Sequence, residues 1–359
     1  MTAPLHFEVW APYAHKVEID IAGKRRVLEP QQDGHWHIDL PLPEGACDYF
    51  FHLDGGPPLP DPRSPWQPEG VRGPSRTVDH RSFPWRHSLP RANPILDRVL
   101  YELHVGTFTT EGTFDAALDH LPHLVELGVT HLELMPVAEF AGSRGWGYDG
   151  IFLFAPHHRY GGPQGLKRFV DEAHGLGLRV LLDVVYSHLG PLGNPLPLFA
   201  PYLKREPTGW GDAMNLDGAG SDEVRRFLLD NVSQWLVDYR FDGLRLDAVH
   251  AFRDVTALSF LEELSLHVGQ LSKASGREME LFVESDRNDP MPIMPRAEGG
   301  FACTALWNDD FHHALHAWLT GETNGYYADY GDLEALQLAL TRGFVLDGRY
   351  SSYRRRRHG

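Results

Sequence analysis

The sequence predicts an N-terminal β-sandwich followed by an α/β barrel of the (β/α)8 type, of which about six strands are present. Three observations lead to this fold class. Short alternating strands punctuated by glycine fill the first 80 residues. From residue 98 the pattern changes to strand, loop and helix. The later strands are apolar and end in polar residues, as the strands of such barrels do at the face that carries the active site.

Residues 1–80 read as a small β domain. Apolar and polar residues alternate in three segments, and a fourth is short and aromatic: 7–11, 17–21, 35–40 and 49–51. Glycines follow or separate these segments, for example Gly23, Gly34 and the Gly55-Gly56 pair. Regularly spaced short strands with such turn signals are typical of a sandwich.

Residues 81–97 are expected to be a linker, because they carry Pro84, Pro90 and Pro94. Proline fixes its own φ angle and lacks an N–H donor, so such a stretch is neither a helix nor a central strand. The proline-rich segment 59–68 is expected to be ordered but irregular for the same reason.

Residues 98–359 are predicted to form the barrel. The expected strands lie at 99–105, 129–137, 179–185, around Leu244, around Leu281, and at 301–307. The expected helices run from Thr113 to Leu127, over 166–174, and from near Ser221. Strands that alternate with helices favour a parallel sheet. No convincing strand follows residue 307, so we expect a truncated barrel with open edges.

Composition narrows the class of protein. The formal net charge is −16, which argues against binding to nucleic acid or to an anionic membrane and favours a neutral substrate. No apolar run approaches the length of a membrane span, and the first residues do not resemble a signal peptide. We therefore expect a cytoplasmic protein.

Cys47 and Cys303 are the only cysteines, and we expect them to be reduced thiols. Their spacing offers no metal site, and we expect no metal and no cofactor. The basic run Arg354–Arg357 is interpreted as a solvated tail, with anion binding as the alternative.

A carboxylate beside an arginine marks the strand around Leu244. Because side chains alternate along a strand, Arg245 and Asp247 share one face. A fixed cation keeps a carboxylate ionised, as a carboxylate nucleophile requires. Glu284 ends the next apolar run, so the two acids suggest a glycosidase pair. The alternative, two structural acids in salt bridges, stays open on spacing alone.

Asp183 and His188 lie at the end of the third predicted strand. We expect Asp183 to pair with Arg245 and orient it, and His188 to donate to a substrate hydroxyl. Either residue could instead be a structural polar group whose hydrogen bonds are satisfied within the protein.

Four segments together resemble the α-amylase superfamily of glycoside hydrolases: 183–188, 243–250, 282–286 and the loop 145–150. The resemblance implies that Asp247 is the nucleophile and Glu284 the acid/base. It also implies that Tyr148, Asp149, Arg245, His188 and His250 contact or support the sugar at the cleavage site. The N-terminal sandwich resembles the glucan-associated module found ahead of such barrels. Trp146 could stack on sugar or pack in the protein.

Further segments resemble the maltooligosyltrehalose trehalohydrolase subfamily: 59–64, 70–75, 307–313, 320–322 and 325–327. These enzymes hydrolyse the α-1,4 bond next to the terminal trehalose unit. The resemblance implies that a substrate subsite is lined by Trp307, Asp309, Asp310, His312 and His313. The alternative for this segment is a structural strand end.

The chain departs from the family pattern in two places. Ser187 stands where many α-amylases carry a calcium-binding asparagine, and serine is a weaker ligand, so no calcium is inferred. The family's Asn-His-Asp segment, which carries the third catalytic carboxylate, does not occur in the sequence.

The function expected from the sequence is therefore release of trehalose from maltooligosyl trehalose. A branching or debranching enzyme of the same superfamily is one alternative. A non-catalytic glucan-binding protein is another, because loss of transition-state stabilisation costs orders of magnitude in rate. The expected partner is maltooligosyl trehalose or a related α-glucan. The oligomeric state stays open, with a homodimer as one alternative.

Overall fold

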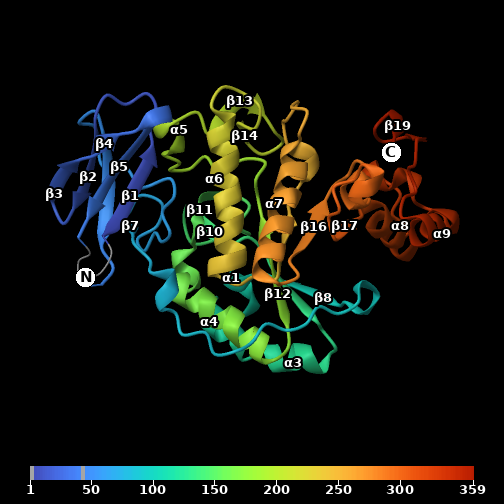
Figure 1. The fold of residues 1–359 in the computed structure, drawn as a ribbon. Coiled ribbons are helices and arrows are strands. Elements are labelled where there is room, and N and C mark those ends of the chain that lie inside the picture. The colour runs from blue at the N-terminus through green and yellow to red at the C-terminus, as the bar shows by residue number, and fades with distance from the viewer. Residues whose placement is uncertain (1–3, 42–44) are drawn as a thin grey trace.

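The computed structural model describes residues 4–41 and 45–359. Two antiparallel sheets lie at the N-terminal end, a parallel sheet with its helices fills the centre, and a small helical unit lies at the C-terminal end (Figure 1). None of the helices in the described ranges has the length and apolar character needed to cross a bilayer.

The N-terminal sheets form the predicted sandwich. One contains β1 (Leu5–Trp10), β5 (His35–Leu40) and β4 (Glu29–Pro30). The other contains β3 (Lys24–Val27), β2 (Val17–Ile21), β6 (Asp48–Leu53) and β7 (Ser75–Arg76). Phe7 of β1 and Tyr49 of β6 meet edge to face between the sheets, with their rings 5.0 Å apart. The sequence did not reveal β3, because its residues are all exposed and do not alternate.

Six parallel strands form one sheet in chain order: β8 (Leu100–Leu103), β9 (His131–Leu134), β12 (Arg179–Val184), β15 (Gly243–Leu246), β16 (Glu280–Glu284) and β17 (Ala305–Trp307). All neighbouring pairs are parallel. This confirms the incomplete (β/α)8 barrel. Within the described residues, the outer strands β8 and β17 each pair on one side only.

The helices of the barrel alternate with its strands: α1 (Val105–Phe108), α2 (Phe114–Leu118), α3 (Leu121–Glu126), α4 (Gly162–Gly175), α5 (Leu196–Phe199), α6 (Ser221–Ser233) with a π-helical turn at Gln234–Asp238, and α7 (Phe260–Ser275). In Figure 1, α6 and α7 stand side by side against the strands.

The single helix expected from Thr113 to Leu127 is wrong. Thr113 does cap a helix, since its side chain accepts from the N–H of Ala116 at 3.2 Å. That helix, α2, ends at Leu118, and α3 begins at Leu121. Pro122 lies in the first turn of α3 and has no N–H to donate to the carbonyl of Leu118, so a continuous helix would lack that hydrogen bond.

Two hairpins extend from the parallel sheet. β10 (Ala138–Phe140) and β11 (Gly150–Pro156) form the first and are joined by the loop 141–149. β13 (Leu203–Pro207) and β14 (Asp212–Met214) form the second. Both hairpins follow barrel strands at their carboxyl ends, so they supply side chains to the same face of the sheet.

The C-terminal unit contains α8 (Asp309–Thr320), α9 (Leu333–Arg342) and the hairpin of β18 (Arg349–Ser351) with β19 (Arg356–His358). Its buried residues form a hydrophobic cluster separate from the main core. The arginine run is therefore not a free tail, which corrects our interpretation. Arg356 and Arg357 are paired in β19, and Arg354 forms an ion pair with Asp286 at 3.1 Å.

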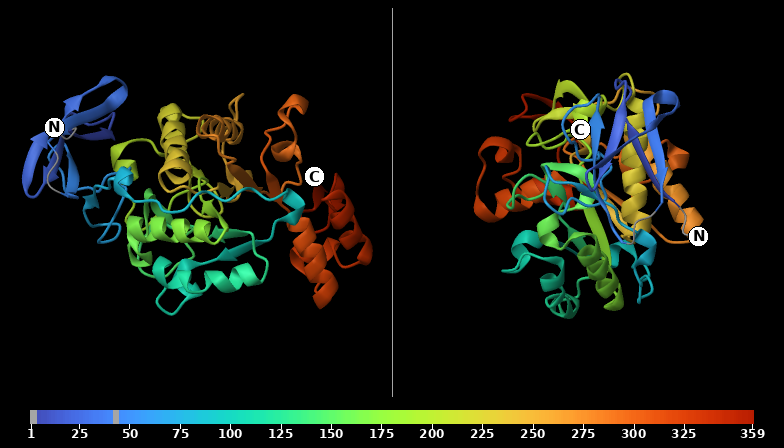
Figure 2. Two further views of the ribbon diagram at one scale, coloured as in Figure 1. Left: turned by 60° about the horizontal axis from the view of Figure 1, so that its bottom comes forward. Right: turned by 90° about the vertical axis from the view of Figure 1, so that its left-hand side faces the viewer.

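The sandwich and the barrel share one continuous hydrophobic core. Trp10 of β1 meets Tyr202 edge to face at 5.3 Å, and His35 lies 3.0 Å from Glu223 of α6. In the left view of Figure 2 the sandwich lies at one end of the molecule and the C-terminal unit at the other. The segment 81–97 crosses from one part to the other along α4, where the N–H of His87 donates to Asp171 at 3.0 Å. The boundaries 1–80, 81–97 and 98–359 remain predictions.

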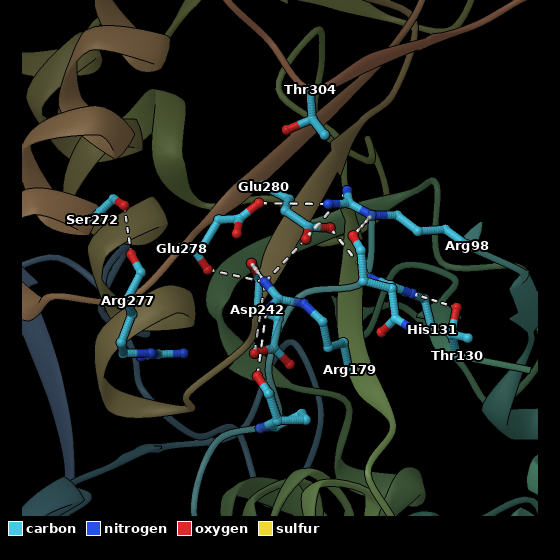
Figure 3. Close-up of polar contacts among 12 residues, drawn as sticks. Arg98, Thr130, His131, Arg179, Asp242, Ser272, Arg277, Glu278, Glu280 and Thr304 are labelled. Atoms are coloured by element: carbon cyan, nitrogen blue, oxygen red, sulfur yellow. Dashed lines mark hydrogen bonds and ion pairs between the residues drawn. The ribbon is translucent and has the colours of Figure 1, made fainter. Parts of the chain in front are cut away.

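A buried ion network lies at the amino ends of the parallel strands (Figure 3). Glu280, the first residue of β16, lies 3.1 Å from Arg179, 3.3 Å from Arg98 and 3.6 Å from His131. Asp242 accepts from the N–H of Val180 at 2.8 Å. These contacts join the first residues of β9, β12 and β16 by charge as well as by backbone pairing.

We predict that Arg179→Ala lowers the free energy of unfolding by about 3–5 kcal/mol, because it leaves the buried carboxylate of Glu280 short of a cation. The matched control is Arg168→Ala, which removes an exposed ion pair with Asp115 and should cost about 1 kcal/mol or less. Urea unfolding of both variants measures the difference. Equal losses would show that the buried network adds no stability.

Candidate active site

Three barrel strands bring charged side chains together at their carboxyl ends. Asp183 of β12 is aligned with Arg245 of β15 in the sheet, and Glu284 of β16 is aligned with Trp307 of β17. Asp247 follows β15 directly. The parallel register thus places Arg245 between three carboxylates: Asp247 after its own strand, Asp183 of β12 and Glu284 of β16.

Arg245 is the centre of this cluster. Its Nη1 lies 2.9 Å from Asp183 Oδ2 and 2.8 Å from Asp247 Oδ1. Its Nη2 lies 2.9 Å from Glu284 Oε2. The guanidinium carbon is 5.1 Å from the ring centroid of Trp307. The expected pair of Asp183 with Arg245 is present, and the same guanidinium also contacts both acids of the expected glycosidase pair.

Burial controls the ionisation of these groups. It raises the pKa of Asp183 to about 7, although Arg245 acts in the opposite direction. Burial also raises the pKa of Asp247 above its ordinary value, and the nearby charge of Glu284 adds to this. Arg245 lowers the pKa of Asp247, as the sequence suggested, but in the substrate-free chain burial outweighs it. That Arg245 keeps Asp247 ionised remains a prediction.

Glu133 of β9 lies beneath the cluster and was not recognised in the sequence. Its Oε1 is 4.0 Å from Arg245 Nε, and neither carboxyl oxygen has a hydrogen-bond partner among the residues that the structure describes. Burial, followed by the charge of Asp183, raises the pKa of Glu133 to about 8. The signal that could have found it is a glutamate inside a fully buried strand.

Carboxyl oxygens of Glu102, Glu133 and Asp183 lie within 4.8 Å of one another, close enough to hold a metal ion. Asp183 already pairs with Arg245, and the raised pKa of Glu133 lets a proton remove its charge. The cluster is therefore accounted for without a cation. A second group with metal-ligand spacing, Glu139 with His157 and His158, lies outside this site.

The β10–β11 loop and the β13–β14 hairpin form one wall of the site. The hydroxyl of Tyr148 donates to Asp183 at 3.0 Å. His188 stacks on Trp210 with centroids 5.9 Å apart, and burial lowers its pKa against the opposing charge of Asp149. Trp210, which is 54% exposed, was missed because a lone tryptophan in a polar loop carries no periodic signal.

His250 and Asp286 stand at the other wall. His250 Nδ1 lies 3.8 Å from Asp286 Oδ1, and Arg354 binds the other oxygen of that carboxylate. Burial opposes ionisation of Asp286, but His250 and Arg354 together lower its pKa. Asp286 therefore stays ionised and ties the C-terminal hairpin to the loop after β16.

In the segment that follows β17, some side chains lie near the site and others pack in the C-terminal unit. The pKa of Asp309 is raised by burial and by the charges of Glu284 and Asp286, which places Asp309 in the field of the site carboxylates. His312 is exposed on α8. His313 packs against Tyr330 with rings 5.3 Å apart, and burial lowers its pKa to about 4.

Asp310 does not face the site. Its carboxylate is buried and accepts from the N–H groups of Val345 and Leu346 at 2.7 and 2.9 Å, from Asn288 at 2.8 Å, and from Tyr330. These partners occupy its acceptor sites, so the structure gives Asp310 a structural position instead of the expected substrate contact. Trp146, in contrast, is 71% exposed at the loop tip.

The arrangement suits acid–base and nucleophilic chemistry on a neutral molecule. Two carboxylates flank one guanidinium at the open end of the sheet, and aromatic and imidazole groups surround them. A pair of carboxyl groups is the usual requirement for breaking a glycosidic bond.

The chain is similar to several known proteins. A family model described as the alpha amylase catalytic domain matches residues 87–193. Malto-oligosyltrehalose trehalohydrolases from Arthrobacter ramosus and Rhizobium sp. (strain M-11) are 50% and 49% identical over 358 and 362 residues, which is 98% of this chain. The chain spans 62% and 61% of their lengths.

Two other matches bear on fold and function. A solved structure described as an alpha amylase from Salmonella typhimurium is 41% identical, with a TM-score of 0.92, over 100% of this chain and 62% of its own. A 1,4-alpha-glucan branching enzyme from Vibrio cholerae is 36% identical over 279 residues, 69% of this chain and 38% of its own.

We predict that Glu133→Gln changes the pH dependence of stability. Because the folded-state pKa is raised to about 8, the folded chain keeps a proton that the unfolded chain loses above about pH 4.5. Protonation of Glu133 therefore adds stability as the pH falls from 8 to 5, by about 1.4 kcal/mol per pH unit at most. Glutamine does not titrate, so the free energy of unfolding of the variant lacks this increase. The difference in stability between wild type and Glu133→Gln should therefore shift in favour of wild type as the pH falls. Urea unfolding at pH 5, 6.5 and 8 measures the difference.

The matched control is Glu126→Gln on the exposed side of α3, which should follow the wild-type curve. Parallel curves for wild type and Glu133→Gln would contradict a proton held at Glu133.

Proposed function

Because this chain belongs to the α-amylase family, we propose that it supplies the catalytic centre of a retaining glycoside hydrolase that releases trehalose from maltooligosyl trehalose. The observation that carries the proposal is the contact of one guanidinium, Arg245, with both Asp247 and Glu284. The names of the relatives that match 98% of the chain support the choice of substrate.

In the proposed reaction, an oxygen of Asp247 attacks the anomeric carbon of the glucose unit next to trehalose. The bond between that carbon and the glycosidic oxygen breaks, and Glu284 gives its proton to the leaving trehalose oxygen. Water then attacks the same carbon, passes a proton to Glu284, and the bond to Asp247 breaks. Two inversions give net retention.

Arg245 contacts both carboxyl groups that the proposed reaction uses. Asp247 must be ionised to attack, and its pKa in the free chain is raised by burial. Arg245 favours its ionised form, and a sugar with partial positive charge at the anomeric carbon would favour it further. Glu284, the proposed acid, lies 2.9 Å from Nη2 of the same guanidinium in the free chain.

We assign the remaining side chains by where they stand. Tyr148 and His188, with Asp149 close to His188, would hold the sugar whose bond is cleaved, and Trp210 beside His188 would stack on it. His250, Trp307 and Asp309 would contact the leaving side, and exposed His312 would lie at its rim. Asp310 and His313 are left out of the proposal, because they belong to the C-terminal core.

One other function has a specific observation behind it. The match to a 1,4-alpha-glucan branching enzyme favours glucan transfer as the alternative reaction.

The test is release of trehalose from a maltooligosyl trehalose. We expect the wild-type chain to release it, and Asp247→Asn and Glu284→Gln to lower kcat by at least about 1,000-fold while the variants remain folded at the assay temperature. The matched controls are Asp119→Asn and Glu126→Gln, both exposed on the α2–α3 side of the barrel.

The outcomes separate the three functions. Action on amylopectin without trehalose release would favour the branching or debranching reaction. Binding of the oligosaccharide without turnover in the wild-type chain would favour a glucan-binding protein. Full activity of Asp247→Asn would overturn the assignment of the nucleophile.

A further inference from the structure

A glutamate and two histidines converge at the base of the β10–β11 hairpin, and the proposed hydrolysis uses none of them. Glu139 is the middle residue of β10. His157 follows β11 directly, and His158 begins the short 3-10 helix His158–Tyr160. The residues therefore come from both strands of the hairpin whose loop carries Tyr148 and Asp149.

The three side chains present donor atoms to one point. Nδ1 of His157 lies 3.1 Å from Glu139 Oε2, and Nδ1 of His158 lies 2.9 Å from Glu139 Oε1. One donor atom from each residue falls within 4.8 Å of the other two. Ligands about 2.1 Å from a tetrahedral zinc ion stand about 3.4 Å apart, and both nitrogen–oxygen separations given above are within about half an ångström of that value.

Two of the three side chains are completely removed from solvent. The side chains of Glu139 and His157 are both 0% exposed. Nε2 of His157 has no hydrogen-bond partner in the described residues, and Nδ1 faces the carboxylate of Glu139 at 3.1 Å. A metal ion at Nδ1 would bind His157 on the side where it already approaches Glu139.

The charge of Glu139 leads to the same conclusion. In the part of the chain that the structure describes, its ion-pair partners within 4.0 Å are these two histidines, with no lysine or arginine among them. A divalent ion between these side chains would place positive charge beside the buried carboxylate, and imidazole and carboxylate are both usual ligands of such ions.

The surroundings have the features of a metal site. The N–H of His158 donates to Glu139 Oε2 at 2.8 Å and fixes the carboxylate, as partners outside the ligand set usually do. The ring of His157 is held against Phe140, 4.0 Å between centroids. His158 is 25% exposed, which gives an ion a route from solvent and leaves a position for water.

We propose that Glu139, His157 and His158 bind one divalent transition-metal ion, with Zn²⁺ the best match to a set of two imidazoles and one carboxylate. The ion would join β10 to the residue after β11 and so stabilise the hairpin that carries Tyr148. The sequence led us to expect no metal, because these ligands are separated by the hairpin. This inference does not depend on the reaction that the chain catalyses.

The test uses Zn²⁺ alone and no sugar. After dialysis against a chelator and then against buffer, isothermal titration with ZnCl₂ should give one ion per wild-type chain, and Zn²⁺ should raise the midpoint of thermal unfolding. His158→Ala should weaken this binding at least about tenfold and abolish the rise. His158 is the least buried ligand, so its loss disturbs packing least.

The matched control is His123→Ala, an exposed histidine of α3, which should bind Zn²⁺ like wild type. If His158→Ala unfolds, wild-type chain loaded with Co²⁺ supplies the second measurement, since tetrahedral nitrogen and oxygen ligands give a visible absorption band that octahedral water does not. Equal Zn²⁺ affinity of His158→Ala and His123→Ala, or no ion bound by folded wild type, would overturn the proposal. A chain that binds Zn²⁺ but releases no trehalose would refute only the proposed function.

Discussion

The ion cluster around Arg245 is the interaction on which the site depends. One guanidinium, nearly buried, contacts carboxylates from three neighbouring strands and lies over the ring of Trp307 from a fourth. Three carboxylates would repel one another at this separation without it. Removing a single partner from such a group leaves an uncompensated charge in a region poor in water. Arg245 therefore holds the three carboxyl groups together at the carboxyl ends of the strands.

The same strands are fixed at their other ends by a second set of charges. β12 begins with Arg179 and carries Asp183 near its end, whereas β16 begins with Glu280 and ends with Glu284. The residues between them are buried and apolar. Each strand is thus held by ion pairs above and below a hydrophobic layer. The lower set has fixed partners and contributes stability, whereas the upper set has partners that a substrate can replace.

Much of this could be predicted from local patterns. Alternation and turn residues gave the sandwich, and the register of parallel strands made the pair of Asp183 with Arg245 foreseeable. Features that depend on distant contacts were not foreseeable. Asp310 is buried because the backbone at residues 345–346 returns to it, and the arginine run is ordered because Arg354 reaches Asp286. No pattern near Asp310 or Arg354 records those contacts.

The continuous core between the sandwich and the barrel has a consequence for cooperativity. Trp10 packs on Tyr202, and the apolar residues of both parts belong to one cluster, so neither part can lose its packing without exposing the other. The sandwich and the barrel should therefore melt in a single transition. The C-terminal unit around Ala317 has its own small cluster and can open as a separate foldon. The change of topology between sandwich and barrel therefore lies within one hydrophobic cluster, whereas the residues after β17 contribute a cluster of their own.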